Sequence, residues 1–188
     1  SLKAVEGNDF STAYMQLVYE VGELFKKHEY LMESPVLNAE EKKKFDDIRY
    51  GRAGKIEVMR SLQILSEFLS KYYNKSVILL IDEYDVPMAR ATSNGYYKEM
   101  LEIMKGFMQA LKDNQCIKLA VITGCLKIAK ESIFTGTNNF VSNTITSSRL
   151  NEYYGFVQNE VDRILEDAEI KGKGEVMKKW YDGYHFGV

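Results

Sequence analysis

Three carboxylates near the middle of the chain have the residue types and the spacing of a metal-dependent phosphate site. Asp82, Glu83 and Asp85 follow directly on the apolar run Val77–Ile81. An apolar run that ends in Asp-Glu is the Walker B arrangement, in which the first carboxylate holds Mg²⁺ and the second polarises the water that attacks a phosphate. The sequence therefore makes Asp82 a candidate Mg²⁺ ligand, Glu83 a candidate general base and Asp85 a further candidate beside them.

The same carboxylates could instead be structural. A buried strand can end in acidic residues only because turns face water, and Asp85 can cap a helix that starts at Val86-Pro87. Neighbouring acids also suggest a metal-nuclease site, but two-metal nucleases draw their acids from separate elements. Since no second acidic strand end is visible in the sequence, the phosphate site and the acidic turn are the main alternatives.

A second apolar run supplies a hydroxyl that can reach the same place. Residues 117–123 indicate a strand that ends at Thr123, and residues 96–111 indicate a helix between the two runs, with Ser93 or Asn94 as its cap. Strand, helix and strand in this order form a βαβ unit, whose parallel strands open onto one crevice at their carboxyl ends. We therefore expect Thr123 to lie close to Asp82 and to sense the same phosphate.

Helical periodicity dominates the chain before these runs. One apolar face repeats from Phe10 to Phe25, and a third helix is expected over residues 56–73. Between them, Asn38 and Glu41 have the spacing of a capping box at the start of a charged helix. These three helices must pack on whatever sheet the apolar runs form.

The apolar runs decide the fold class. Neither Val77–Ile81 nor the core of residues 117–123 alternates strictly with polar residues, which is typical of strands buried on both faces of a parallel sheet. Together with the helices, they predict an α/β protein with a three-layer α/β/α architecture and a mainly parallel sheet. After Thr123 we expect a long loop, a short strand over residues 143–146, and two helices that Gly172 and Gly174 separate.

A phosphate-binding loop should accompany a Walker B motif. The nearest candidate is residues 51–55, with the sequence GRAGK. Its glycine spacing differs from GxxxxGK[ST], Ile56 stands where Ser or Thr is needed, and no buried strand leads into it. We interpret this segment as a turn between two helices.

Composition narrows the classes of protein further. The chain has 188 residues, of which 45% are hydrophobic, and its formal net charge is −2. A chain with nearly equal numbers of acidic and basic side chains lacks the excess positive charge that is typical of nucleic-acid-binding domains. Its longest apolar run is far short of the roughly 20 residues that span a bilayer. Cys116 and Cys125 cannot form a disulfide framework. We expect one domain in a cytoplasmic protein that has no membrane partner.

Four segments in order resemble one protein family. They are VILLIDEYDVP at 77–87, TGCLKIAKESIF at 123–134, YGF at 154–156 and WYDGYHF at 180–186. The series is similar to the bacterial AAA-ATPase-like domain family, whose members often carry a C-terminal domain of the PD-(D/E)XK nuclease superfamily. The resemblance covers nearly all of the chain.

The resemblance implies a P-loop NTPase fold of the AAA-like branch, with ATP and Mg²⁺ as ligands. Asp82 then matches the Mg²⁺-binding Walker B acid, Glu83 the catalytic glutamate, and Thr123 the polar sensor after the next strand. Lys127 and Lys130 match basic residues of the loop after the sensor. The resemblance assigns these two lysines no role, and solvated loop lysines are the alternative.

The chain departs from the family pattern at its start. In the family, a Gly-Lys-Ser loop precedes the point that corresponds to Ser1, so the strand and helix of the phosphate loop are expected to be missing. Residues 1–188 are then a fragment that holds the Walker B and sensor half, and this chain alone is not expected to hydrolyse ATP. The incomplete sheet would expose edges that invite self-association.

Two functions follow for the longer parent protein. The first is an ATPase or ATP-binding domain that needs Mg²⁺. The alternative is a non-hydrolysing scaffold of NTPase-like fold that binds protein or nucleic acid. Any contact with nucleic acid would use a region outside this chain, because the net charge of these residues does not favour it.

Overall fold

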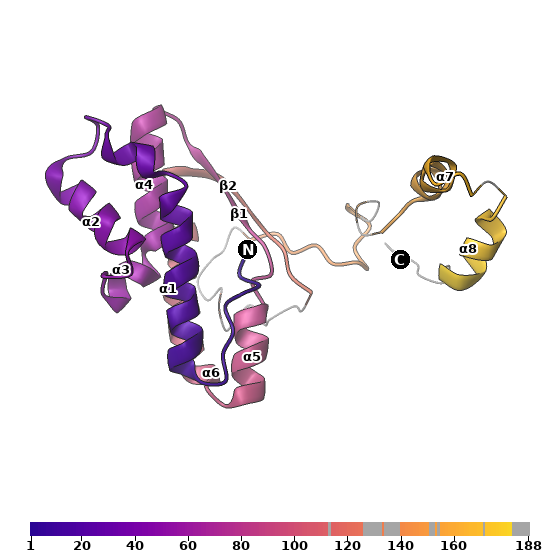
Figure 1. Cartoon of the computed structure of the whole chain (residues 1–188), viewed down its shortest axis with the longest axis horizontal. Coiled ribbons are helices and arrows are strands. Elements are labelled where there is room, and N and C mark those ends of the chain that lie inside the picture. The colour runs from indigo at the N-terminus through magenta and orange to yellow at the C-terminus, as the bar shows by residue number, and fades with distance from the viewer. Residues whose placement is uncertain are drawn as a thin grey trace. The chain divides into compact units, whose positions relative to one another are not determined.

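The computed structural model describes residues 1–112, 114–125, 133, 140–150, 153, 155–170 and 172–181. The chain forms two compact units, Ser1–Thr137 and Asn138–Val188. Helices and two strands make up the first unit (Figure 1), and the second contains helices α7 and α8. No helix among the described residues has both the length and the apolar character that crossing a membrane requires.

The first helices form where the periodicity and the capping residues predict them. Helix α1 spans Phe10–Lys26, and the Asp9 carboxylate caps it by accepting the Thr12 N–H at 2.9 Å. Helix α2 spans Ala39–Arg49 after the short 3₁₀ helix η1 at Glu29–Met32. The capping box is present in both directions, since Asn38 Oδ1 accepts the Glu41 N–H and the Glu41 carboxylate accepts the Asn38 N–H.

The single helix expected over residues 56–73 is wrong in one respect. The structure divides it into α3 at Lys55–Met59 and α4 at Ser61–Tyr73, with Arg60 at φ −96° and ψ 4° between them. Helix α3 packs on α6, where Gly106 leaves the room that the Met59 side chain occupies. The change of direction therefore arises from packing on another helix, which the local apolar pattern does not record.

The two apolar runs form neighbouring parallel strands, as expected. Strand β1 spans Val77–Ile81 and β2 spans Ile117–Ile122, and the register pairs Ile78 with Leu119 and Ile81 with Ile122. A register shift lies between Val77 and Ile78. Among the described residues these two strands are the whole sheet, so the fold is mixed α/β with a small parallel sheet and many helices.

The expectation that both strand faces are buried is wrong for the described part of the chain. Ile81 is only 6% exposed, whereas Ile78 is 58% and Leu80 70% exposed, and Leu119 and Val121 on β2 are exposed as well. Helices α1 and α4 lie on one side of the strands (Figure 1), and they line a cavity with β1. The described helices cover one face of the sheet and leave the other uncovered.

The crossover between the strands contains two helices. Helix α5 spans Val86–Asn94 and ends at Gly95, whose φ of 82° is left-handed; α6 spans Tyr97–Met108 and continues into the 3₁₀ helix η2 at Gln109–Leu111. The prediction that Ser93 or Asn94 caps the second helix is wrong, because both belong to α5 and the cap of α6 is Tyr96. The two crossover helices pack against each other.

The core of the first unit is apolar, and α1, α2 and α6 supply most of its fully buried large side chains, while α4 adds buried residues such as Leu65 and Phe68. Its fully buried large side chains are Val5, Leu17, Phe25, Leu31, Phe45, Ile48, Val58, Met88, Met100, Ile103, Met104 and Met108. Cys116 and Cys125 are free thiols, as the cysteine count predicts. This helical core supports one face of the strands and thereby fixes where their carboxyl ends lie.

The second unit contains two short helices. Helix α7 spans Gln158–Asp167 and α8 spans Gly174–Tyr181, so the two expected helices are present, although Gly174, expected between them, is the first residue of α8. The short strand expected at residues 143–146 is wrong, because the chain turns there and the Ser147 N–H bonds the Thr144 carbonyl at 2.9 Å. The Thr144 N–H also donates to the Ser147 hydroxyl, so local side-chain bonds take the place of a strand ladder.

Candidate functional site

The parallel strands bring Asp82 and Thr123 together at their carboxyl ends. The Thr123 hydroxyl donates to Asp82 Oδ1 at 2.5 Å, although the residues are 41 positions apart. The ladder continues just beyond the strands, because the Thr123 N–H donates to the Ile81 carbonyl at 2.9 Å. Both side chains are exposed. The predicted juxtaposition is therefore present and open to solvent.

A tight turn places Glu83 beside this pair. Asp82 Oδ1 also accepts the Glu83 N–H at 3.0 Å, and the Val86 N–H donates to the Glu83 carbonyl at 3.2 Å. Glu83 has a φ of 55°, in the left-handed region that residues with a side chain seldom occupy. Because the backbone turns at Glu83, the side chains of Asp82 and Glu83 lie in different surroundings.

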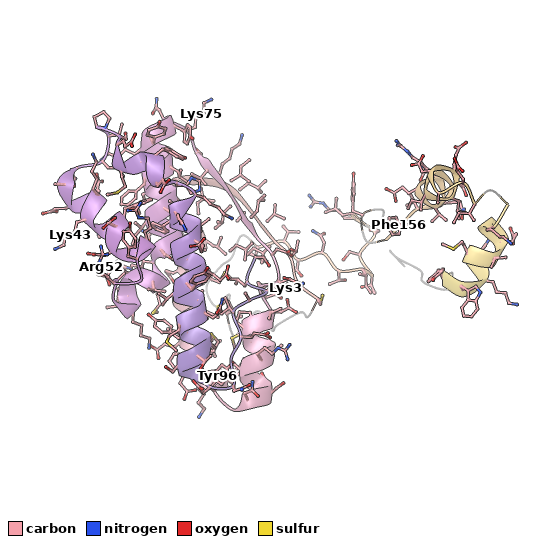
Figure 2. All side chains as sticks on the ribbon, in the orientation of Figure 1. Lys3, Lys43, Arg52, Lys75, Tyr96 and Phe156 are labelled. Atoms are coloured by element: carbon pink, nitrogen blue, oxygen red, sulfur yellow. The ribbon has the colours of Figure 1, made fainter. Side chains whose placement is uncertain are left out.

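The amino-terminal segment contacts both acids, a feature that sequence reasoning missed. The Ser1 hydroxyl donates to Glu83 Oε2 at 2.8 Å, and the Leu2 N–H donates to the Asp82 carbonyl at 2.9 Å. Figure 2 labels the next residue, Lys3, near this end of the strands. No local motif marks Ser1 or Leu2, because their role depends on a contact with a distant strand.

The same segment also reaches the far end of α5. The Gly7 carbonyl accepts from Asn94 Nδ2 at 3.0 Å and from the Tyr96 hydroxyl at 2.8 Å, and Arg90 forms an ion pair with Glu6 at 2.6 Å. Residues 1–7 therefore run beside α5, with hydrogen bonds to the turn before it and to the residues at its end.

Asp85 has a different environment from the other two acids. It is only 4% exposed and begins α5, where its carbonyl accepts the Met88 and Ala89 N–H groups. Helix α5 does start at Val86-Pro87 with Asp85 as its N-cap residue, as the structural alternative expected, but the Asp85 side chain makes no capping hydrogen bond to α5. The three acids also do not converge, since the described residues contain no group of three or more His, Cys, Asp or Glu side chains that could hold a metal ion.

The arrangement of Asp82 and Thr123 fits the ligand preferences of Mg²⁺ but does not fit a two-metal nuclease centre. Mg²⁺ prefers oxygen ligands and keeps several waters, so one exposed carboxylate beside a hydroxyl, as in Asp82 and Thr123, fits its chemistry. A two-metal nuclease centre needs several converging acids. The described residues do not provide them, and the nuclease interpretation loses its support.

The segment 51–55 is a turn between α2 and α3, as expected. The Arg52 and Ala53 N–H groups both donate to the Asp47 carbonyl, at 2.7 and 3.0 Å, so these amides are already engaged. Arg52 pairs with Asp46 and Asp47, and Lys55 pairs with Glu102. Figure 2 labels Arg52 among the helices, apart from Lys3. This turn cannot cradle a phosphate at the Asp82 site.

One cavity of the first unit lies beside the acids and is not lined by them. It has a volume of about 380 Å³ between α1, α4 and β1, and its lining includes Ser1 and Leu2 but neither Asp82, Glu83 nor Thr123. Lys127 and Lys130 lie outside the described residues, so their predicted place beside the sensor is not addressed by the geometry.

Comparison with known proteins agrees with the motifs. The family described as "Predicted AAA-ATPase" matches residues 5–134, which include both strands and the acidic turn. A protein of Azotobacter chroococcum mcd 1, described as "Uncharacterized protein in vnfD 5'region", is 27% identical over 113 residues. That match covers 58% of this chain and 22% of the relative, so the chain spans about a fifth of the relative's length. No solved structure matches the chain. By its sequence over residues 5–134, the chain belongs to the predicted AAA-ATPase family.

Proposed function

We propose that this chain carries the Mg²⁺-binding and water-activating half of an ATPase site in a P-loop domain of three-layer α/β/α architecture. The observation that carries the proposal is the hydrogen bond between Thr123 and Asp82 at the carboxyl ends of two parallel strands. Membership of the predicted AAA-ATPase family supports nucleotide as the ligand. In this proposal residues 1–188 are the Walker B and sensor part of one AAA-like domain.

Each side chain has a distinct task in the proposal. Asp82 is the ligand of Mg²⁺, which when bound would neutralise charge on the nucleotide phosphates. Glu83 accepts a proton from the attacking water. The single O–H of Thr123 donates to Asp82 Oδ1, so Thr123 holds the Mg²⁺-binding carboxylate in place and senses the phosphate through it. The Ser1 hydroxyl donates to the Glu83 carboxylate and thereby fixes its position. The neighbouring Leu2 N–H bonds the Asp82 carbonyl, so the same segment contacts both acids.

The phosphate cradle is a part of the site that these residues do not supply. The turn at 51–55 is engaged in helix packing, so we infer that the phosphate cradle comes from outside residues 1–188 and that the isolated chain does not turn over ATP. Lys127 and Lys130, which follow Thr123 in the sequence, stay candidate site residues with no assigned role. A cytoplasmic location, self-association through the open sheet, and contact with nucleic acid only through other regions complete the proposal.

The test uses the natural full-length protein and the substitution Glu83→Gln, which keeps the size of the side chain and removes the base. We expect Mg²⁺-ATP to bind with unchanged affinity and turnover to fall by about 10²–10⁴-fold, the usual contribution of a general base. Glu99→Gln, at an exposed position of α6, is the matched control. Equal turnover for Glu83→Gln and the control would remove the role assigned to Glu83.

A non-hydrolysing scaffold is the second candidate function. It is favoured by one observation, that two amides of the glycine-rich turn, those of Arg52 and Ala53, are bonded to the Asp47 carbonyl. Calorimetric titration of the full-length protein with ATP and Mg²⁺ separates the two candidates. Binding heat that is lost in Asp82→Asn supports the ATPase site, and absence of heat at millimolar nucleotide supports the scaffold.

A further inference from the structure

Gly124 follows the sensor threonine and lies unusually close to the turn after β1. A Cβ atom built on Gly124 would lie 2.7 Å from two carbons of the Tyr84 ring and would also overlap the Asp85 carboxylate. Real Cβ atoms essentially never come so near to other atoms. Only glycine therefore permits this approach between the end of β2 and the β1–α5 turn.

The backbone holds the two segments together at the same point. The Tyr84 N–H donates to the Thr123 carbonyl at 3.2 Å, and the Thr123 N–H donates to the Ile81 carbonyl at 2.9 Å. The backbone of Thr123 is thus bonded both to Ile81, which precedes Asp82, and to Tyr84, which follows Glu83. The direction of its hydroxyl, which reaches Asp82 Oδ1, depends on this double attachment.

Asp85 faces this contact from the beginning of α5. It is nearly fully buried, and its Oδ1 is the atom nearest to the Cβ built on Gly124. Asp82, three residues earlier, is exposed. The turn therefore divides its acids, with one facing solvent at the strand ends and one packed inward against the residue after the sensor.

We propose that Asp85 and Gly124 are positioning residues, whose contact fixes the Thr123 hydroxyl against Asp82. The inference deepens the ATPase proposal and rests on it for its catalytic meaning. Asp85 then does not bind Mg²⁺ or substrate. It acts through Thr123, by keeping the sensor strand and the acidic turn at the separation that the Thr123–Asp82 hydrogen bond requires.

Amide hydrogen exchange on the 188-residue chain tests the positioning role without nucleotide. Gly124→Ala should speed exchange of the Tyr84 N–H by roughly tenfold, because the added Cβ pushes Thr123 away from its partner. The Val77 N–H, which bonds the Cys116 carbonyl at the other end of the ladder, should be unaffected and reports that the sheet is still formed. Gly174→Ala is the matched control, since a Cβ at Gly174 meets nothing within 4 Å.

A second pair of variants keeps the test decisive if Gly124→Ala fails to fold. Asp85→Ala should release the Tyr84 N–H by a similar factor of roughly ten, and Asp85→Asn, which preserves the shape, should restore protection to within about twofold. Unchanged Tyr84 exchange in Asp85→Ala would overturn the proposal. Equal loss in Asp85→Ala and Asp85→Asn would also overturn it, because it would assign the effect to charge and not to the contact.

Turnover by the full-length protein supplies the catalytic readout. Asp85→Ala should lower kcat by about 10²-fold while nucleotide affinity stays unchanged, as expected for a sensor displaced by about 1 Å. A matching loss of affinity would contradict a positioning role. If the unmodified protein does not hydrolyse ATP, the proposed function fails, and the exchange experiment still decides whether Asp85 and Gly124 position Thr123.

Discussion

Asp82, Glu83 and Asp85 differ in exposure because of one left-handed residue. The chain turns at Glu83, where φ is 55°, so Asp82 stays at the exposed strand end and Asp85 enters the interior beside Gly124. Residue types indicate which side chains are candidates to bind Mg²⁺ or a proton, and this assignment stays a prediction. They could not predict the inward direction of Asp85, because it depends on Gly124, which follows the next strand.

The left-handed conformation makes a prediction about stability at Glu83. Glu83→Gly and Glu83→Ala remove the same carboxylate, but only glycine adopts a positive φ without steric cost. We expect the glycine variant to be more stable than the alanine variant by about 1 kcal/mol in urea unfolding of the chain.

Glu102 in the middle of α6 provides the comparison for this pair. At a helical position the order should be reversed, with glycine about 1 kcal/mol less stable than alanine. If glycine is the less stable variant at both positions, Glu83 does not hold a left-handed conformation in solution.

At the scale of elements, helix positions are more predictable than helix directions. The apolar face of α1 and the capping box of α2 are local features, and both helices form where these features lie. The start of α5 at Val86-Pro87 also has a local signal. The break at Arg60 is not local, because it arises where α3 meets α6. Sequence periodicity therefore identifies the helices and leaves their packing undetermined.

The burial of strand β1 is also something that its sequence pattern does not predict. Five apolar residues in succession hide the alternation of the pleat, so the sequence suggested burial on both faces where the chain exposes Ile78 and Leu80. The alternation reappears in the backbone. The Ile81 carbonyl bonds Thr123 on β2, whereas the Asp82 carbonyl bonds Leu2 on the other side, so Leu79 directs its backbone groups toward β2 and Leu80 away from it.

This alternation predicts opposite effects of proline at two adjacent residues. Leu80→Pro removes an N–H that points away from β2 and should be tolerated, as proline is on the open side of an edge strand. Leu79→Pro removes an N–H that bonds β2 and should cost about 1–3 kcal/mol more, because it leaves an acceptor unpaired. Urea unfolding of both variants, each compared with its alanine counterpart to subtract the lost side chain, measures the difference. Equal costs would mean that β1 does not pair with β2 in this register.

At the scale of the whole molecule, the family match and the core coincide. The match over residues 5–134 falls inside the unit Ser1–Thr137. Nearly all buried apolar side chains of the described residues belong to that unit, and Leu165 is the exception in the other. The resemblance of the motifs to the family is thus carried by the part of the chain that has an extensive core. The motifs at 154–156 and 180–186 lie beyond the match.

This distribution predicts how the chain responds to division after Thr137. Residues 1–137 should unfold cooperatively with a midpoint within about 4 °C of the whole chain, since a change of about 1 kcal/mol shifts the midpoint of a domain of this size by only a few degrees. Residues 138–188 alone should show no cooperative transition, because one buried leucine among their described residues cannot offset the entropy of folding. Thermal melts of the three chains, followed by circular dichroism, test both statements. A midpoint for residues 1–137 that falls by about 10 °C or more, on the order of 2 kcal/mol, would show instead that residues after Thr137 stabilise the strands that hold Asp82 and Thr123.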